Sequence, residues 1–277
     1  MFVDVDSGAA MPNGLNWTTA YTTPQAGIDA CEVRLGQTNP PAACEVWTAE
    51  GTYYVYASAG TDTVQLKANV HLYGGFAGTE GARDARDWAT HVTTLTGYSS
   101  DITSRVYHVT SGADDAVLDG FTVRDGFANA AYPDDSSAGI FLINGSSPIV
   151  RNTIFTHNVA TDDGAVAKIN LGASPVFINC VFKNGIAGGD GGAVVLNAAG
   201  APRFEGCVFE DNQASAQGGV FKTYATHPEF VNCVFRRNQG DLGGAGYCMK
   251  YTPMFTNCLF QGNVASGMGG ALYIVGQ

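Results

Sequence analysis

The sequence predicts an all-β fold, a right-handed parallel β-helix (a solenoid) with a short capping helix at its N-terminal end. A motif marked by a proline and a phenylalanine recurs five times in the second half of the chain, with a period of about 25–27 residues that is typical of stacked repeats. Only 14% of the 277 residues are charged, against about 25% in typical soluble domains, and 36 are glycine. A repeat of this period in a glycine-rich chain favours stacked coils of short strands.

Prolines set the register of the repeat, and other residue types recur at fixed distances after them. The prolines are Pro148, Pro175, Pro202, Pro228 and Pro253. A phenylalanine follows each at a constant distance, at Phe155, Phe182, Phe209, Phe235 and Phe260. The last four copies carry a cysteine shortly before this phenylalanine, at Cys180, Cys207, Cys233 and Cys258. An asparagine precedes the cysteine position in four copies, at Asn152, Asn179, Asn232 and Asn257, and Gly206 takes this place in the third copy.

Stacking explains why the same residue type returns at each position. One coil cannot bury its own apolar face, whereas stacked coils place like residues above one another at the strand spacing of about 4.8 Å. We therefore expect core ladders of phenylalanine, cysteine and asparagine. A second asparagine row, after the phenylalanine, is expected to exchange amide hydrogen bonds at a corner, at Asn158, Asn212, Asn238 and Asn263. Leucine-rich repeats, propeller blades and calcium-binding nonapeptide rolls have other periods or consensus residues.

The pattern divides the chain into three parts. Residues 138–277 form the regular coils, and residues 51–137 form irregular early coils with loops at 74–91 and 127–137. Residues 1–50 form a cap that contains a strand and a helix at 23–36, with Thr23 as N-cap, Pro24 as first helical residue and Gly36 as terminator. The sequence ends inside a repeat, so we expect the solenoid to be truncated at its C-terminus.

Cysteines and acidic residues are the candidates for chemistry. Cys31 and Cys44 flank a loop outside the repeat and form a candidate disulfide, whereas the cysteines of the repeat are interpreted as buried packing residues. No catalytic residue is assigned, because the row three residues after each proline is mixed and the five histidines form no motif. No cofactor is expected. Calcium is considered only at four turn acids, Asp162, Asp163, Asp190 and Asp241, and Lys168, Lys222 and Lys250 are taken to lie at different registers.

Charge and hydropathy exclude two classes of partner. The net charge is −11 and no basic run is present, so we expect no nucleic-acid partner. No apolar run approaches the roughly 20 residues of a membrane-spanning helix, and no signal peptide is visible in this segment.

Several segments resemble bacterial right-handed β-helix surface proteins. They include Trp17-Thr18-Thr19-Ala20-Tyr21, Val46-Trp47-Thr48-Ala49-Glu50-Gly51-Thr52-Tyr53 and Leu72-Tyr73-Gly74-Gly75-Phe76. The later Gly192-Ala193 and Phe209-Glu210-Asp211-Asn212 are similar to repeats of chlamydial polymorphic outer-membrane proteins. The resemblance implies an exported protein, extracellular or at the bacterial cell surface, with adhesion or surface display as its function and a surface protein or a glycan as partner.

The leading hypothesis from the sequence is a non-catalytic cell-surface scaffold. Many β-helices cleave polysaccharides, so the first alternative is a polysaccharide lyase or glycoside hydrolase with a groove formed by the loops at 74–91 and 127–137. The second alternative is a repeat module of a filament. The sequence leaves the oligomeric state open.

Overall fold

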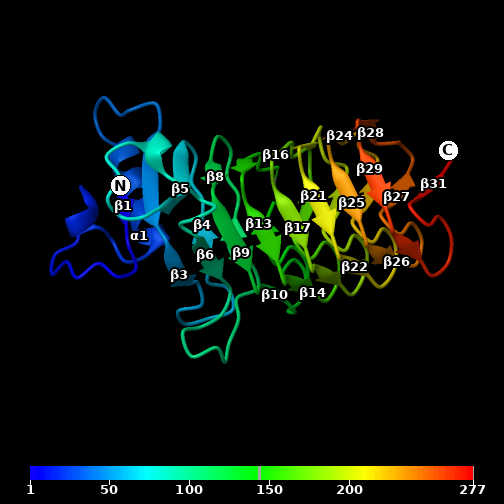
Figure 1. Cartoon of the computed structure of the whole chain (residues 1–277), viewed down its shortest axis with the longest axis horizontal. Helices are drawn as coiled ribbons and strands as arrows, with labels where there is room; N and C mark the ends of the chain where they lie inside the picture. Colours follow the sequence, from blue (N-terminus) through cyan, green and yellow to red (C-terminus); the bar gives the residue numbers. More distant parts are fainter. Residues whose placement is uncertain (143–144, 277) are drawn as a thin grey trace.

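The computed structural model describes residues 1–142 and 145–276, and it is a solenoid of parallel strands (Figure 1). Residues 143–144 and 277, within the range expected for regular coils, lie outside the described part. The solenoid runs from the N-terminus at one end of the long axis to the C-terminus at the other, and each strand pairs with the equivalent strand of the next coil.

Two long sheets meet at one edge of every coil. The first contains β1 (Phe2–Val3), β2 (Cys44–Ala49), β5 (Val70–Phe76), β8 (Val117–Asp119), β12 (Ile149–Arg151), β16 (Val176–Ile178), β20 (Arg203–Glu205), β24 (Glu229–Val231) and β28 (Met254–Thr256). The second contains β3 (Gly51–Tyr54), β6 (Thr93–Thr96), β9 (Phe121–Arg124), β13 (Ile154–Thr156), β17 (Val181–Lys183), β21 (Val208–Glu210), β25 (Val234–Arg236) and β29 (Leu259–Gln261).

Shorter sheets close the remaining sides. The third contains β10 (Phe127–Ala128), β14 (Val159–Ala160), β18 (Ile186–Ala187), β22 (Gln213–Ala214), β26 (Gln239–Gly240) and β30 (Val264–Ala265). The fourth contains β15 (Ala167–Asn170), β19 (Val194–Asn197), β23 (Phe221–Tyr224), β27 (Gly246–Met249) and β31 (Leu272–Val275). On the same side, the earlier coils contribute β4 (Val64–Gln65), β7 (Thr110–Ser111) and β11 (Ile140–Phe141), and β11 contacts β15.

The core between the sheets is a stack of phenylalanines. Phe182 and Phe209 are fully buried, and their ring centroids lie 4.7 Å apart at an interplanar angle of 14°. Phe235 continues the stack, with its centroid 4.9 Å from that of Phe209. Each cysteine of the repeat donates its Sγ–H to a carbonyl of the preceding coil, as Cys233 does to Phe204 at 3.4 Å. Such ladders remove apolar surface from water. This burial stabilises the fold by about 25 cal/mol per Å² of apolar area.

The two asparagine rows have different roles, and the row expected in the core is not buried. Asn179, Asn232 and Asn257 are exposed and Asn152 is half-buried. All four have φ between 46° and 54°, and Gly206 in the same row has φ 62°. Asparagine and glycine tolerate this left-handed conformation better than other residues, so the corner geometry selects them here rather than core packing.

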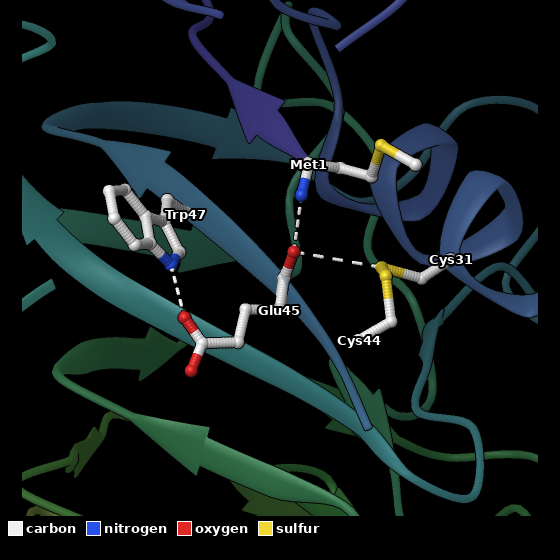
Figure 2. Close-up of a disulfide and its surroundings, with 5 residues drawn as sticks. All are labelled: Met1, Cys31, Cys44, Glu45 and Trp47. Atoms are coloured by element: carbon white, nitrogen blue, oxygen red, sulfur yellow. Dashed lines mark hydrogen bonds between the residues drawn. A yellow bond between two sulfur atoms is a disulfide. The ribbon is translucent and has the colours of Figure 1, made fainter. Parts of the chain in front are cut away.

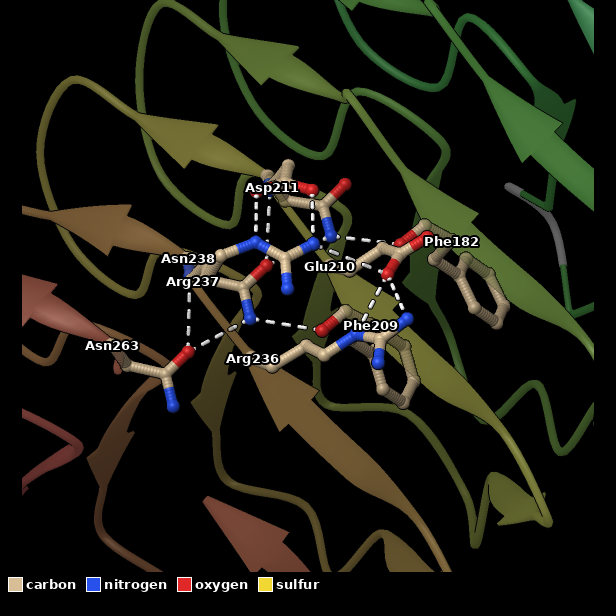
Figure 3. A network of polar contacts seen from close by, with 9 residues as sticks. Phe182, Phe209, Glu210, Asp211, Arg236, Arg237, Asn238 and Asn263 are labelled. Atoms are coloured by element: carbon tan, nitrogen blue, oxygen red, sulfur yellow. Dashed lines mark hydrogen bonds and ion pairs between the residues drawn. The ribbon is translucent and has the colours of Figure 1, made fainter. Parts of the chain in front are cut away.

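The second asparagine row is buried and hydrogen-bonded between coils. Asn238 donates from Nδ2 to the carbonyl of Phe209 at 3.0 Å and to Oδ1 of Asn263 at 2.9 Å (Figure 3). Asn212 makes the equivalent bonds one coil earlier, to Phe182 and to Asn238. These amides satisfy backbone groups that the corner would otherwise leave unpaired in the interior.

The cap covers the first coil. The α-helix α1 (Pro24–Leu35) is N-capped by Thr23, whose Oγ1 accepts from the N–H of Ala26 at 3.3 Å, and its C-cap is Gly36. Its buried face includes Ile28. With 12 residues, it is too short to cross a bilayer, and it is the only α-helix among the described residues.

A disulfide joins this helix to the first long sheet. Cys31 of α1 is bonded to Cys44 of β2 (Figure 2). Beside it, the carbonyl of Glu45 accepts from the amino group of Met1, and the Glu45 carboxylate accepts from the Trp47 indole at 2.7 Å. Two short 3₁₀ helices, η1 (Trp17–Thr19) and η2 (Arg83–Ala85), complete the helical elements.

Both expected loops begin later than the sequence indicates. Strand β5 continues through Phe76, so the first loop spans 77–92, and β10 occupies the start of the second. Gly75 has φ 91°, and a Cβ there would lie 2.6 Å from Cα of Trp88, so only glycine lets this loop pack so closely. A buried ion pair of 2.9 Å between Arg86 and Asp119 fixes the loop to the stack.

Candidate functional site

Three of the four turn acids considered for calcium lie at one corner of the solenoid, beside two lysines. We call Asp162, Asp163, Lys168, Asp190 and Lys222 the Asp–Lys corner. Lys168 of β15 and Lys222 of β23 lie in the same outward row, because each pairs with Val195 of β19 between them. The expectation that these two lysines fall at different registers is therefore wrong.

The sequence already contains this register. Lys168 follows Pro148 at the same distance along the chain as Lys222 follows Pro202. Lys250 lies slightly farther from the proline of its own coil, Pro228, and comes just after the end of β27. Counting from the proline would therefore have placed two of the three lysines in one row.

Each lysine of the corner neutralises an aspartate that also supports the next coil. Lys168 Nζ lies 2.9 Å from Oδ2 of Asp163 and 3.6 Å from Oδ2 of Asp162. Lys222 forms an ion pair with Asp190. The second oxygen of Asp190 accepts the N–H of Gln217 in the following coil at 2.8 Å. These carboxylates thus act as turn caps that are compensated by lysine.

The electrostatics of this corner oppose a role for Lys168 as a general base. Burial alone lowers the pKa of Lys168, but its hydrogen bond with Asp163 and the neighbouring carboxylates outweigh burial and raise that pKa. Burial and the charge of Asp163 raise the pKa of Asp162. A lysine held charged cannot remove a proton as a general base, because such a base needs a pKa near the working pH.

The acids do not gather into a metal site. Asp241 lies farther along the solenoid and accepts from the Ser266 hydroxyl at 2.7 Å. Among residues 1–142 and 145–276, no three His, Cys, Asp or Glu side chains are arranged to hold a metal ion. Asp241 is thus apart from the other three calcium candidates, and all four are engaged with protein groups.

His108 lies near this corner, and both of its ring nitrogens are engaged. Nδ1 lies 3.0 Å from the carbonyl oxygen of Ser137, and Nε2 lies 3.0 Å from Oδ1 of Asp134. The ring packs on Phe141 at 4.5 Å between centroids. This arrangement orients the imidazole as a packing and hydrogen-bonding group and leaves no ring nitrogen open for a substrate.

A second site lies among the irregular coils and escaped the sequence analysis. We call it the Arg105 groove, a hollow of about 570 Å³ whose main walls are Tyr56, Tyr98, Arg105, Tyr107 and Phe127. Tyr56 follows β3, Tyr98 follows β6 and Phe127 begins β10, so three successive corners contribute to it. Tyr98 and Arg105 form an antiparallel bridge at the base of the loop between them. Three tyrosines and an arginine in the irregular part were the only sequence signal.

The Arg105 side chain is held by aromatic rings. Its Cζ lies 5.3 Å from the ring centroid of Tyr98 and 4.3 Å from that of Phe127. No carboxylate lies within ion-pair distance of it among the described residues, and no acidic residue lines the groove. The guanidinium is therefore held in place without being neutralised.

The two loops beside the groove, at 57–62 and 99–104, are held by hydrogen bonds within each loop. Burial alone raises the pKa of Asp62, but hydrogen bonds from the N–H groups of Ala59, Ser58 and Ala57 outweigh it and lower that pKa. In the loop at 99–104, Asp101 accepts from the hydroxyls of Ser99 and Thr103, at 2.6 and 2.8 Å. Because these acids are satisfied within their own loops, the groove is preformed.

A comparison with known protein families assigns the chain to one of them. The family described as a right-handed β-helix region matches residues 108–277, more than half of the chain. The chain belongs to this β-helix family. No curated protein and no solved structure shows significant similarity to it. The match covers the Asp–Lys corner, whereas Tyr56, Tyr98, Arg105 and Tyr107 precede it, so most of the Arg105 groove lies in the part that the family does not describe.

Proposed function

We propose that this β-helix is a non-catalytic scaffold, exported to the bacterial cell surface, that binds a partner glycan through its irregular coils. The observation that carries the proposal is a contrast between two regions. The acids of the Asp–Lys corner are paired with lysines or cap backbone groups. The irregular coils hold a preformed groove with an uncompensated cation.

Export is supported by the disulfide between Cys31 and Cys44. Structural disulfides persist in oxidising compartments and are rare in the cytosol of most organisms. The cap that this disulfide holds also covers the end of the solenoid, where an open sheet edge would favour aggregation.

Outward ion pairs between coils support a structural role for the regular part. Arg236 Nε lies 2.7 Å from the Glu210 carboxylate of the preceding coil, and Arg237 makes two bonds to Asp211, at 2.9 and 2.7 Å (Figure 3). Opposite charges on neighbouring strands favour the correct register. An active-site face would instead present groups left open for a substrate.

A binding and turnover panel tests the proposal. Acidic and neutral polysaccharides are immobilised to measure binding, and the same polymers are incubated with the protein and calcium to measure unsaturated products and new reducing ends. We expect saturable binding to at least one polymer and no product. Turnover that disappears in Asp163→Asn or Lys168→Met would overturn the proposal and assign cleavage to the Asp–Lys corner.

A further inference from the structure

We propose that the Arg105 groove binds a carboxylate-bearing sugar residue of an acidic glycan. This inference rests on the proposed glycan-binding function and names its site and ligand class. Its elements are a fixed guanidinium, aromatic walls and polar lining side chains, in a hollow that no acidic side chain lines.

The Arg105 groove holds a cation in a chain that is acidic overall. The chain has a net charge of −11, and six other arginines pair with carboxylates, namely Arg83, Arg86, Arg124, Arg203, Arg236 and Arg237. Arg34, Arg105 and Arg151 form no ion pair among the described residues, and of these three only Arg105 lies over aromatic rings. An arginine kept free of acids inside a preformed groove is suited to an anionic ligand.

The N–H donors of the Arg105 guanidinium are available to a ligand. The Arg105 Cζ lies over the rings of Tyr98 and Phe127, and the five N–H donors of a guanidinium lie in its plane. Among the described residues, no hydrogen bond from these donors to a protein acceptor is present. A carboxylate matches this planar fork and accepts two parallel hydrogen bonds from it.

The lining of the hollow favours a sugar over a simple anion. The hollow is lined by Tyr56, Tyr98 and Tyr107, and by Thr103, Ser104 and Asn129. A pyranose presents an apolar ring face with hydroxyls at its edge, so it uses aromatic walls and polar side chains together. A volume of about 570 Å³ lies within the range of about 300–1,000 Å³ typical of small-ligand sites. A bare phosphate or sulfate would leave the aromatic walls without a partner.

Isothermal titration with matched oligosaccharides tests the inference. The probes are trigalacturonate with its methyl ester, and sialyllactose with lactose. In each pair the second member lacks the charge, and the two pairs separate a uronate from a sialate. We expect one of the acidic probes to bind at least tenfold more tightly than its neutral counterpart, with affinity that falls as salt is added.

Matched variants locate the binding site. Arg105→Gln should weaken binding of the acidic probe by at least about tenfold, the loss of roughly 1.4 kcal/mol, with an unchanged melting temperature. Arg105→Lys should recover only part of it, because an ammonium lacks the planar fork. The control is Arg151→Gln, which removes an exposed arginine of β12 and should leave the affinity unchanged.

Each contrary outcome has a distinct meaning. Equal affinity of the acidic and neutral probes, or an unchanged affinity in a folded Arg105→Gln variant, overturns the inference while glycan binding by the scaffold stands. Absence of binding to all four probes also overturns it. Cleavage of a probe contradicts the proposed non-catalytic function instead.

Discussion

The carboxylate of Asp163 links Lys168 of its own coil to Asp190 of the next coil. One oxygen lies 2.9 Å from the lysine Nζ, and the other accepts the backbone N–H of Asp190 at 3.0 Å. Asp162, its neighbour, makes only a longer contact of 3.6 Å with the same lysine. Two adjacent aspartates of one turn thus differ in what they contribute to the stack.

Substitution of each aspartate by asparagine should separate these roles. Asp163→Asn leaves the nearly buried lysine without its main partner, so the free energy of unfolding should fall by about 2 kcal/mol. Asp162→Asn removes a carboxylate whose pKa burial raises, so stability should stay within about 0.5 kcal/mol or increase. Denaturant unfolding of both variants measures the difference. Equal losses in the two variants would contradict the assigned roles.

The pH dependence of stability should reflect the raised pKa of Lys168. A group whose pKa is higher in the folded than in the unfolded protein stabilises the fold at pH values below its unfolded pKa, which is about 10.4 for lysine. This stabilisation is lost as the pH rises through the pKa of the folded protein. The stability advantage of the wild type over Lys168→Met should therefore be full at neutral pH and shrink in the alkaline range. The outward Lys183→Met serves as control, and a pH-independent advantage would argue against the ion pair.

The buried asparagine row should matter more to stability than the exposed one. Asn212→Ala removes donors to Phe182 and Asn238 and leaves the N–H of Gly185 without its acceptor, which should cost about 3 kcal/mol. Asn179→Gly should change stability by less than about 1 kcal/mol, because Gly206 occupies the same left-handed position one coil later. Thermal unfolding of the two variants compares the rows, and a larger loss for Asn179→Gly would reverse this ranking.

The loop over the first coils should depend on the buried ion pair between Arg86 and Asp119. Both side chains are less than a tenth exposed, and Arg86 also donates to the carbonyl of Gly74 at 2.8 Å. Arg86→Ala leaves a buried carboxylate uncompensated and should cost about 3–5 kcal/mol. Hydrogen exchange should show faster exchange within 77–92. The exposed Arg34→Ala provides a control in the cap, and unchanged exchange in the Arg86 variant would show that the loop is held by other contacts.

The regular coils were predictable because packing and sequence share one period. The interval from proline to phenylalanine fixes the strands from β12 to β29, and an equal offset from the proline places Lys168 and Lys222 in one row. The role of Asn179 was not predictable from recurrence alone, because both a core ladder and a left-handed corner repeat the same residue. The Arg105 groove was missed because its walls come from corners that share no motif.

The central claim is that this β-helix binds a ligand at its irregular coils and uses its acidic corner for stability. The most direct test measures oligosaccharide affinity, melting temperature and product release together for Arg105→Gln and Asp163→Asn. We predict that Arg105→Gln loses affinity and keeps its melting temperature, whereas Asp163→Asn melts at a lower temperature and keeps its affinity, with no product from either variant or the wild type. Product release by the wild type that Asp163→Asn abolishes would contradict the account.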